Sequence, residues 1–386
     1  MADGEKVVLA LHAYRTRIWN AQYAGLVRYC TPRGWMVKDA CLGRAPDHAA
    51  VRRALRNDDI VGVISSLQVP LPADALAGRP AVFFDCPKEA VSAGSPHIRH
   101  DAKQTAHLAV NELMTLPLRC FAYAHSPWDL YWSKDRGRAF EAEIVRRGGL
   151  LEPAFKRPGV FDGRRRIALL AKWVASLPKP CGIFAANDEM ARAVMAACSR
   201  VSVKVPGDVA VVGVDDDSKF CLAKPSLTSV VPDWNAGAFL AAQALDRLVR
   251  GIPAAAHDTT FRPMGLVRRQ STGHGSQSRS EPNVLAAVGL IREKACSGLR
   301  AIEVLREMRG SRRHAEQMFR GLTGMSVLEA IRKVRFENAK VLLETTERPV
   351  AFVGEVSGYQ SVTTFCREFK AETGLSPAAW RKKSQM

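Results

Sequence analysis

Residues 358–377 read GYQSVTTFCREFKAETGLSP, and residues 311–326 read SRRHAEQMFRGLTGMS. The two stretches repeat one pattern with a constant offset of 50 residues. The matching pairs are Ser311 and Ser361, Phe319 and Phe369, Arg320 and Lys370, Thr323 and Thr373, Gly324 and Gly374, Met325 and Leu375, and Ser326 and Ser376. A fixed period of this length indicates a duplicated supersecondary unit.

Each copy is predicted to be a helix-turn-helix unit, because two short helices joined by a glycine-containing turn form that motif. The first helices and their turns are expected at Ala301–Met308 with Gly310, and at Ala351–Val356 with Gly358. The second helices begin at Ser311 and near Ser361. Between the units, Ser326-x-x-Glu329 is a capping box that predicts a long helix to about Leu343.

The second helices have two distinct faces. The apolar face is expected to comprise Ala315, Met318, Phe319 and Leu322 in the first unit, and Phe365 and Phe369 in the second. Residues in the N-terminal half of a recognition helix reach base edges in the major groove. The outward positions predicted to bind DNA are Arg312, Arg313, Glu316 and Gln317, and Val362, Thr363, Cys366 and Arg367. The alternative is a merely solvated face.

The first 270 residues alternate strands and helices, which predicts parallel sheets covered on both faces. Strands are expected at Lys6–Ala10, Val61–Ser65, Ala81–Phe84, Cys120–Ala124, Gly182–Ala185 and Val209–Val214, with helices such as Ala102–Met114 and Met190–Ser199. Residues 271–282 lack apolar periodicity and are predicted to be a linker. After it, Val284, Val288, Ile291 and Ala295 share one helical face, which begins an all-α domain at 283–386.

Composition narrows the function classes. The net charge of +18 favours a polyanionic partner, although residues 283–386 carry only 18 Lys and Arg against 11 Asp and Glu. Nine cysteines are scattered without C-x-x-C spacing, so neither a disulfide framework nor a metal site is expected. No apolar run is long enough to span a membrane, and the N-terminus carries acids where a signal peptide carries bases. We therefore expect a cytoplasmic protein without cofactors.

The C-terminal repeat resembles the DNA-binding domain of the arabinose-activator (AraC) family over residues 283–386. The resemblance rests on Ser311–Gly324, on Arg332-x-x-Arg335-x-x-x-Ala339, and on the pattern GYxSxxxFxxxFxxxxGxSP at 358–377. Two positions depart from the family pattern: Ala315 replaces the usual Leu and Gln317 the usual Arg. The resemblance implies a transcription regulator that binds double-stranded DNA and contacts RNA polymerase.

Residues 1–270 resemble the sensor of the lactose-repressor (LacI/GalR) type, which is related to periplasmic sugar-binding proteins. The supporting stretches are IFAANDEMA at 183–191, VPGDVAVVGVDD at 205–216 and PSLTSV at 225–230. This resemblance implies two lobes, approximately 1–116 plus 232–257 and 117–231 plus 258–270, and a homodimer. It also implies a small sugar effector, with a pentose such as xylose favoured by the combination with an AraC-type reader. Ser65, Ser66 and Gln68 stand where an acid-bearing loop is expected in a xylose sensor, so the ligand stays open.

The effector is expected between the lobes, beyond the carboxyl ends of the strands. Polar and aromatic residues at such ends are the candidates, and they are Trp19, Asn20, Asp101, Arg136, Asn187, Asp188 and Asp215. Each has a structural alternative. The three aspartates could cap helices, Arg136 could pair with Asp135 or Glu141, and Trp19 could lie in the core.

Two other functions compete with that of a regulator. An enzyme would need a catalytic motif, but the chain lacks a phosphate loop, a G-x-S-x-G elbow and an H-E-x-x-H helix. A sugar-binding carrier of the same fold would fit the N-terminal part but leaves the basic C-terminal repeat without a role. The sequence predicts neither the effector nor whether transcription is activated or repressed.

Overall fold

The computed structural model describes residues 6–384 apart from 14–15, 44–45, 57–58, 72–73, 75, 77, 129, 253–257, 275–283, 309 and 324. The chain divides into two compact units. We describe the two-lobed α/β sensor and the C-terminal helical domain separately. Most of the predicted linker, at 275–282, lies outside the described residues.

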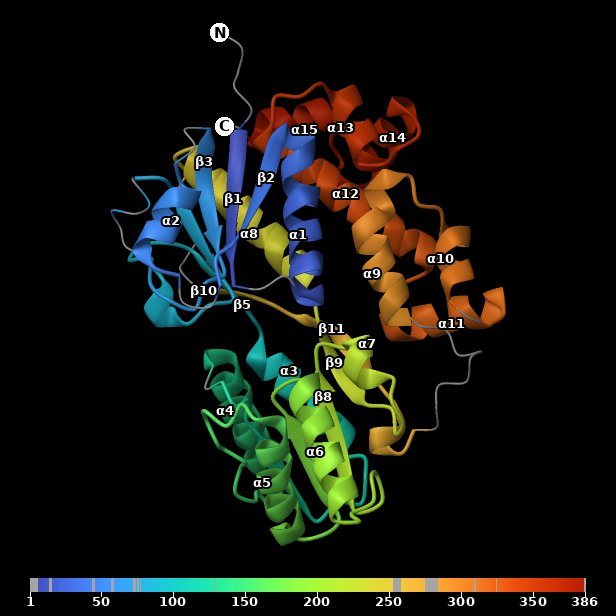
Figure 1. Ribbon diagram of the computed structural model, residues 1–386. Helices are drawn as coiled ribbons and strands as arrows, with labels where there is room; N and C mark the ends of the chain where they lie inside the picture. Colours follow the sequence, from blue (N-terminus) through green and yellow to red (C-terminus); the bar gives the residue numbers. More distant parts are fainter. Residues whose placement is uncertain are drawn as a thin grey trace. The chain divides into compact units, whose positions relative to one another are not determined.

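Each sensor lobe is built on one sheet (Figure 1). The first sheet has the order β10 (Asp258–Phe261), β5 (His97–His100), β4 (Ala81–Phe84), β3 (Ile60–Ser65), β1 (Lys6–His12) and β2 (Trp35–Cys41). The second has the order β11 (Pro263–Val267), β9 (Thr228–Pro232), β8 (Val209–Val214), β7 (Cys181–Ala185) and β6 (Cys120–Ala124). Neighbours from β6 to β9 are parallel, and β11 is an antiparallel edge. The predicted two-lobed α/β sensor is thus confirmed.

Helices cover both faces of the second sheet because its strands are apolar on both sides. The helices α3 (Ala102–Leu113) and α4 (Tyr131–Arg146) contribute to one buried cluster, whereas α5 (Gly163–Ser176) and α6 (Asp188–Arg200) contribute to the other. In the first lobe, α8 (Trp234–Val249) packs on β3, β4 and β5. The remaining sensor helices are α1 (Arg17–Cys30), α2 (His48–Ala54) and the single turn α7 (Ser218–Cys221).

The lobe boundaries differ from the predicted ones at two places. Strand β10, expected in the second lobe, pairs in parallel with β5 of the first. Helix α3, expected in the first lobe, packs on α4, β9 and β11 of the second. Both errors arise where the chain crosses between lobes, since a strand's own residues do not determine which sheet it joins.

The start of the predicted linker belongs to the sensor instead. Ser271 and Thr272 are completely buried. The Ser271 hydroxyl donates to the Val211 carbonyl at 2.6 Å, and the Thr272 hydroxyl donates to Glu112 Oε1 at 2.8 Å. Polarity alone therefore misled the prediction, because these hydroxyls are buried with hydrogen-bond partners.

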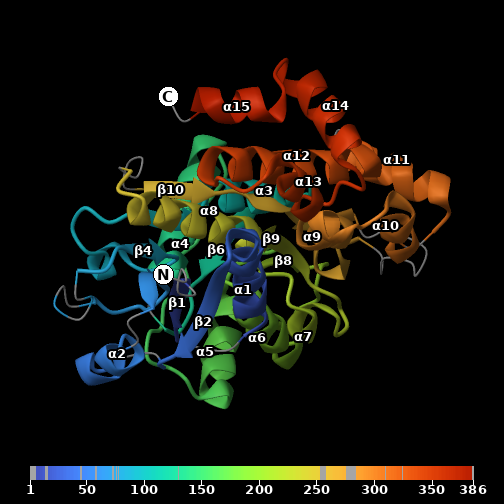
Figure 2. The ribbon, with the colours of Figure 1, turned by 90° about the horizontal axis from the view of Figure 1, so that it is seen from above.

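The C-terminal domain contains the two predicted helix-turn-helix units. Its helices are α9 (Val284–Lys294), α10 (Ala301–Glu307), α11 (Arg312–Thr323), α12 (Val327–Thr345), α13 (Val350–Val356), α14 (Val362–Thr373) and α15 (Pro377–Ser384). Helix α12 contacts α10 and α11 of the first unit and α13 of the second (Figure 2). The Ser326–Glu329 capping box that begins α12 is present. The all-α domain is confirmed.

Equivalent residues form the cores of the two units. Phe319 lies in one buried cluster, and Phe365 and Phe369 lie in the other. Met318 was expected on the inward face of α11, but 42% of its surface is exposed. The inward stripe of α11 is therefore narrower than predicted; the side chain of Leu322 and residue Gly324 lie outside the described part.

The turn of the second unit requires glycine at position 358. Gly358 has φ +84°, in the left-handed region. A Cβ atom there would lie 2.7 Å from the Ala295 carbonyl oxygen and 2.9 Å from the Cys296 Cα. Both the backbone conformation and the close packing against the 3₁₀ turn Ala295–Ser297 therefore exclude a side chain.

None of the described helices combines the length and the apolar character needed to cross a membrane.

Candidate effector site and DNA-reading helices

The ionised carboxylate of Asp85 makes one of the contacts between the sensor lobes. Asp85 directly follows β4 and has φ +48°. Its Oδ1 accepts hydrogen bonds from His100 Nδ1 at 2.9 Å and from the Tyr131 hydroxyl at 2.5 Å. Burial alone would raise the pKa of Asp85, but the hydrogen bonds from His100 and Tyr131 and the positive charge of Arg136 lower it. Asp85 was not among the predicted site residues.

His100 supplies a hydrogen-bond acceptor next to this carboxylate. Burial, and then the positive charge of Arg136, lower the pKa of the imidazole, so it is neutral near pH 7. Because Nδ1 donates to Asp85, Nε2 carries no hydrogen. That buried Nε2 has no hydrogen-bond partner.

Arg136 is buried in α4, and its Nη1 donates to the Ala186 carbonyl at 2.6 Å. The guanidinium lies 5.0 Å from the centre of the Trp132 ring, and its Nε is unpartnered. Neither predicted ion pair is found, because Asp135 pairs with Arg99 and Arg138 instead. Arg136 therefore brings an uncompensated donor into the same region as Asp85.

Asp215 follows β8 and lies close enough to Arg136 and Asp85 for their charges to affect its pKa. Its Oδ1 is buried and has no hydrogen-bond partner. Burial raises the pKa of Asp215 to about 7; Arg136 opposes this shift, whereas Asp85 and Asp217 reinforce it. The residue also has φ +107°, a conformation rare outside glycine.

Three further polar atoms nearby lack partners. Gln68 donates through Nε2 to the Asp85 carbonyl at 3.2 Å, but its buried Oε1 is unpartnered. Trp234 begins α8, its ring centre is 6.2 Å from that of His100, and its Nε1 is unpartnered. The Oδ1 of the adjacent Asn235 is also buried without a partner. The sequence analysis did not include these residues among the candidates, although Trp234 and Asn235 follow the strand β9 and the cap residue Asp233.

Two of the predicted residues lie together on α1. Trp19 is buried and stacks on His12, with ring centres 3.7 Å apart, so much of its surface belongs to the first-lobe core. Asn20 is exposed. The contacts described for Trp19 and Asn20 do not include Asp85, His100, Arg136 or Asp215.

Asp101 and Asn187 cap helices, as the structural alternative proposed for aspartates. Asp101 Oδ1 accepts from the Gln104 amide at 3.0 Å at the start of α3. Asn187 Oδ1 accepts from the Met190 amide at 3.0 Å at the start of α6. The capping leaves only the amide nitrogen of Asn187 and the second oxygen of Asp101 for other contacts.

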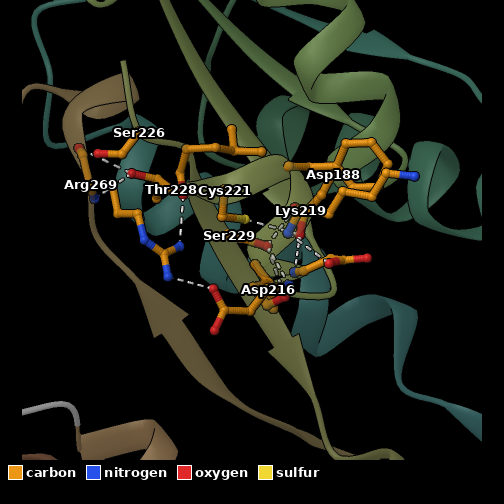
Figure 3. Close-up of polar contacts among 12 residues, drawn as sticks. Asp188, Asp216, Lys219, Cys221, Ser226, Thr228, Ser229 and Arg269 are labelled. Atoms are coloured by element: carbon orange, nitrogen blue, oxygen red, sulfur yellow. Dashed lines mark hydrogen bonds and ion pairs between the residues drawn. The ribbon is translucent and has the colours of Figure 1, made fainter. Parts of the chain in front are cut away.

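Asp188 is buried in the second lobe, where its carboxylate is surrounded by hydrogen-bond donors (Figure 3). Its carboxylate accepts from the Ser229 hydroxyl at 2.6 Å, the Asp217 amide at 2.8 Å and the Cys221 thiol at 3.2 Å. Burial, and then the charge of Asp215, raise its pKa to about 8. The role that the structure supports for Asp188 is to organise the loop that carries Asp215.

The predicted DNA-reading positions are mostly exposed. Arg312, Arg313 and Gln317 on α11, and Val362, Thr363 and Arg367 on α14, lie at the surface. Two positions are half-buried: Cys366 packs against the core of its unit, and Glu316 Oε1 accepts from the Val327 amide at 3.1 Å. Glu316 therefore contributes to the start of α12.

Both parts of the chain match known families. Residues 110–272 match the periplasmic binding protein-like domain, and residues 304–383 match a helix-turn-helix domain. The chain thus combines a periplasmic binding protein-like domain with a C-terminal helix-turn-helix domain of the AraC type.

The chain is homologous to xylose operon regulatory proteins. That of Haemophilus influenzae is 27% identical over 296 residues, which are 74% of each protein. That of Escherichia coli K12 is 28% identical over 254 residues, 65% of this chain and 64% of the relative. These relatives are regulators, in agreement with the prediction that the chain is not an enzyme.

Solved structures support the fold. A xylose-binding transcription activator superposes with a TM-score of 0.57 at 21% identity, covering 99% of both chains. A LacI family transcriptional regulator from Arthrobacter sp. FB24 superposes with a TM-score of 0.56 at 26% identity, covering 70% of this chain and 99% of the other.

Proposed function

We propose that this DNA-binding regulator is switched by an uncharged sugar held between its sensor lobes, with a pentose such as xylose as the first candidate. The observation that carries the proposal is the set of buried polar atoms without partners. Four of them are acceptors, on Gln68, His100, Asp215 and Asn235, and two are donors, on Arg136 and Trp234.

A buried polar atom without a hydrogen bond destabilises the protein by about 1–3 kcal/mol. A ligand that satisfies this set must both donate and accept several hydrogen bonds, which is the chemistry of a polyhydroxyl compound. The names of the xylose operon relatives favour a pentose. Of the predicted residues, Arg136 and Asp215 are proposed as direct contacts, whereas Trp19, Asn20, Asp101, Asn187 and Asp188 are proposed to shape the site.

Calorimetry on the full chain with D-xylose, L-arabinose, D-ribose, D-glucose and D-galactose tests the proposal. We expect binding of at least one pentose and weaker binding of the matched acid D-xylonate, because Asp85 is ionised. Asp215→Ala should weaken sugar binding by about 1–3 kcal/mol. Absence of heat with every neutral sugar would contradict a sugar effector.

We further propose that the regulator acts in the cytoplasm as a homodimer, since two linked readers on one DNA gain from high effective concentration. Contact with RNA polymerase belongs to the same proposal. Gel shifts with the region upstream of the chain's own gene, with and without the sugar, test regulation, and sedimentation at micromolar concentration tests the dimer. A purely monomeric species with and without DNA would contradict the dimer.

A further inference from the structure

The loop that carries Asp215 is held in an unusual conformation. Asp215 and Asp216 have φ +107° and +50°, two consecutive left-handed residues that are not glycine. Such a backbone persists only when its surroundings impose it. Here the Asp216 amide donates to the Ser229 hydroxyl at 3.0 Å, and the Asp217 amide donates to Asp188 at 2.8 Å.

A third restraint comes from the segment by which the chain leaves the sensor (Figure 3). Arg269 follows β11, and its Nη2 donates to Asp216 Oδ1 at 2.6 Å. Its Nη1 donates to the Leu227 carbonyl and its amide to the Thr228 hydroxyl, each at 2.8 Å. The ion pair is largely shielded, with 11% of the Arg269 side chain and 22% of the Asp216 side chain exposed.

Residues 268–274 are anchored to the sensor on both sides of Arg269. Glu112 at the end of α3 is buried and accepts from Arg268 Nε at 2.7 Å and from the Thr272 hydroxyl at 2.8 Å, and it lies 2.8 Å from His274 Nε2. The next described residue after His274 is Val284, in the DNA-reading domain. Residues 268–274 are thus the last described part of the sensor before the helices of the DNA-reading domain.

We propose that the Arg269–Asp216 ion pair conveys occupancy of the effector site to residues 268–274, so that Arg269 is a positioning residue for regulation of DNA binding. The inference rests on the proposed function. A ligand that bonds to Asp215 biases the conformation of the 215–217 loop, and Asp216 shares that backbone. Because the ion pair joins this loop to the exit segment, the two are expected to shift together.

The test compares the full chain with the variants Arg269→Gln and Asp216→Asn. The measured quantity is the dissociation constant for a DNA duplex from the region upstream of the chain's own gene, and the readout is the ratio of its values with and without saturating D-xylose. We expect both variants to keep xylose affinity within about threefold and to lose the ratio, which should fall to within about twofold of one. Arg166→Gln, which breaks the Arg166–Glu189 pair in the same lobe, is the matched control and should keep the wild-type ratio.

Folded Arg269→Gln and Asp216→Asn proteins that retain the wild-type ratio would overturn the proposal. A second measurement needs no sugar. Relative to wild type, Asp215→Asn should change the hydrogen exchange of the peptide that covers residues 268–274. When the ion pair is already removed, the same substitution should have no effect, so Asp215→Asn/Asp216→Asn should exchange like Asp216→Asn alone. Unaltered exchange in Asp215→Asn would also overturn the proposal, whereas failure of every sugar to bind would count against the proposed effector and leave the exchange result standing.

Discussion

Tyr131 donates its phenolic hydrogen to Asp85 over 2.5 Å and thereby joins α4 of the second lobe to the end of β4 in the first. A hydrogen bond to a charged group contributes about 1.5–3 kcal/mol. We expect Tyr131→Phe to lower sugar affinity by about 10- to 100-fold in calorimetry, because the bond supports the arrangement that holds the ligand.

Tyr123→Phe is the control for this change. Tyr123 is also a tyrosine of the second lobe, more deeply buried than Tyr131, but its hydroxyl donates at 2.9 Å to the Ser133 carbonyl within that lobe. The control should lower the unfolding temperature and leave affinity unchanged. Equal losses of affinity in both variants would show that the Tyr131 effect is not specific to the lobe contact.

The raised pKa values predict that the sensor loses stability as pH rises. Asp188, with a pKa of about 8 when folded and an ordinary value of 3.8, binds a proton in the folded state between these values. Its contribution is complete below about pH 4 and is lost as pH rises through about 8. Asp188→Asn imitates the protonated form, so urea unfolding from pH 5 to 9 should show a smaller decrease in the free energy of unfolding than wild type.

Asp215→Asn should act in the same direction over a lower window, because the pKa of Asp215 is about 7. If the Asp188→Asn variant instead shows the same dependence of unfolding free energy on pH as wild type, the Asp188 carboxyl is ionised in the folded state throughout pH 5 to 9.

Gly358→Ala should destabilise the C-terminal domain by about 2 kcal/mol or more, since the strained backbone and the close contacts each contribute about 1–3 kcal/mol. Gly374 is the matched control: its φ is +73°, but nothing lies within 4 Å of an added Cβ. Gly374→Ala should therefore cost only about 1 kcal/mol, from the backbone conformation. Chemical unfolding of both variants measures the difference, and equal losses would show that the contacts with Ala295 and Cys296 are unimportant.

Arg313→Ala and Arg367→Ala should each weaken DNA binding by about 1–3 kcal/mol and relax sequence preference at different base pairs. Lys382 is exposed on α15, outside the recognition helices. Lys382→Ala should weaken binding to all DNA sequences about equally, because a phosphate contact is lost. Footprinting with sequence-variant duplexes separates the outcomes. If both arginine variants disturb the same base pairs, the two readers do not bind separate half-sites.

A sensor fragment ending at residue 277 should be more stable than one ending at residue 270. The shorter fragment lacks Ser271 and Thr272, leaving Glu112 and the Val211 carbonyl buried with fewer partners. Each lost bond destabilises by about 1–3 kcal/mol, so we expect a lower unfolding temperature for the shorter fragment. Indistinguishable thermal unfolding of the two fragments would mean that this segment does not stabilise the sensor.

The fold was largely predictable because its signals are local. Apolar runs such as Val209–Val214 and the 50-residue repeat are visible without any knowledge of distant contacts. Asp85 and Tyr131 were missed because they are 46 residues apart and acquire meaning only when two lobes meet. The same limit applies to Asp188. The sequence shows that this carboxylate follows a strand, but it does not show whether the side chain points toward a ligand or into the lobe.

The repeat combines identical helix ends with different surfaces. Thr323 and Thr373 close their helices in the same way, donating to Phe319 and Phe369 carbonyls at 2.8 Å. The exposed faces, by contrast, carry Arg312 and Arg313 in one copy and Val362 and Thr363 in the other. A protomer with two unlike readers in fixed chain order has a direction. A bound operator would then have two different ends, and inverting its sequence would exchange the positions of the two readers relative to the promoter.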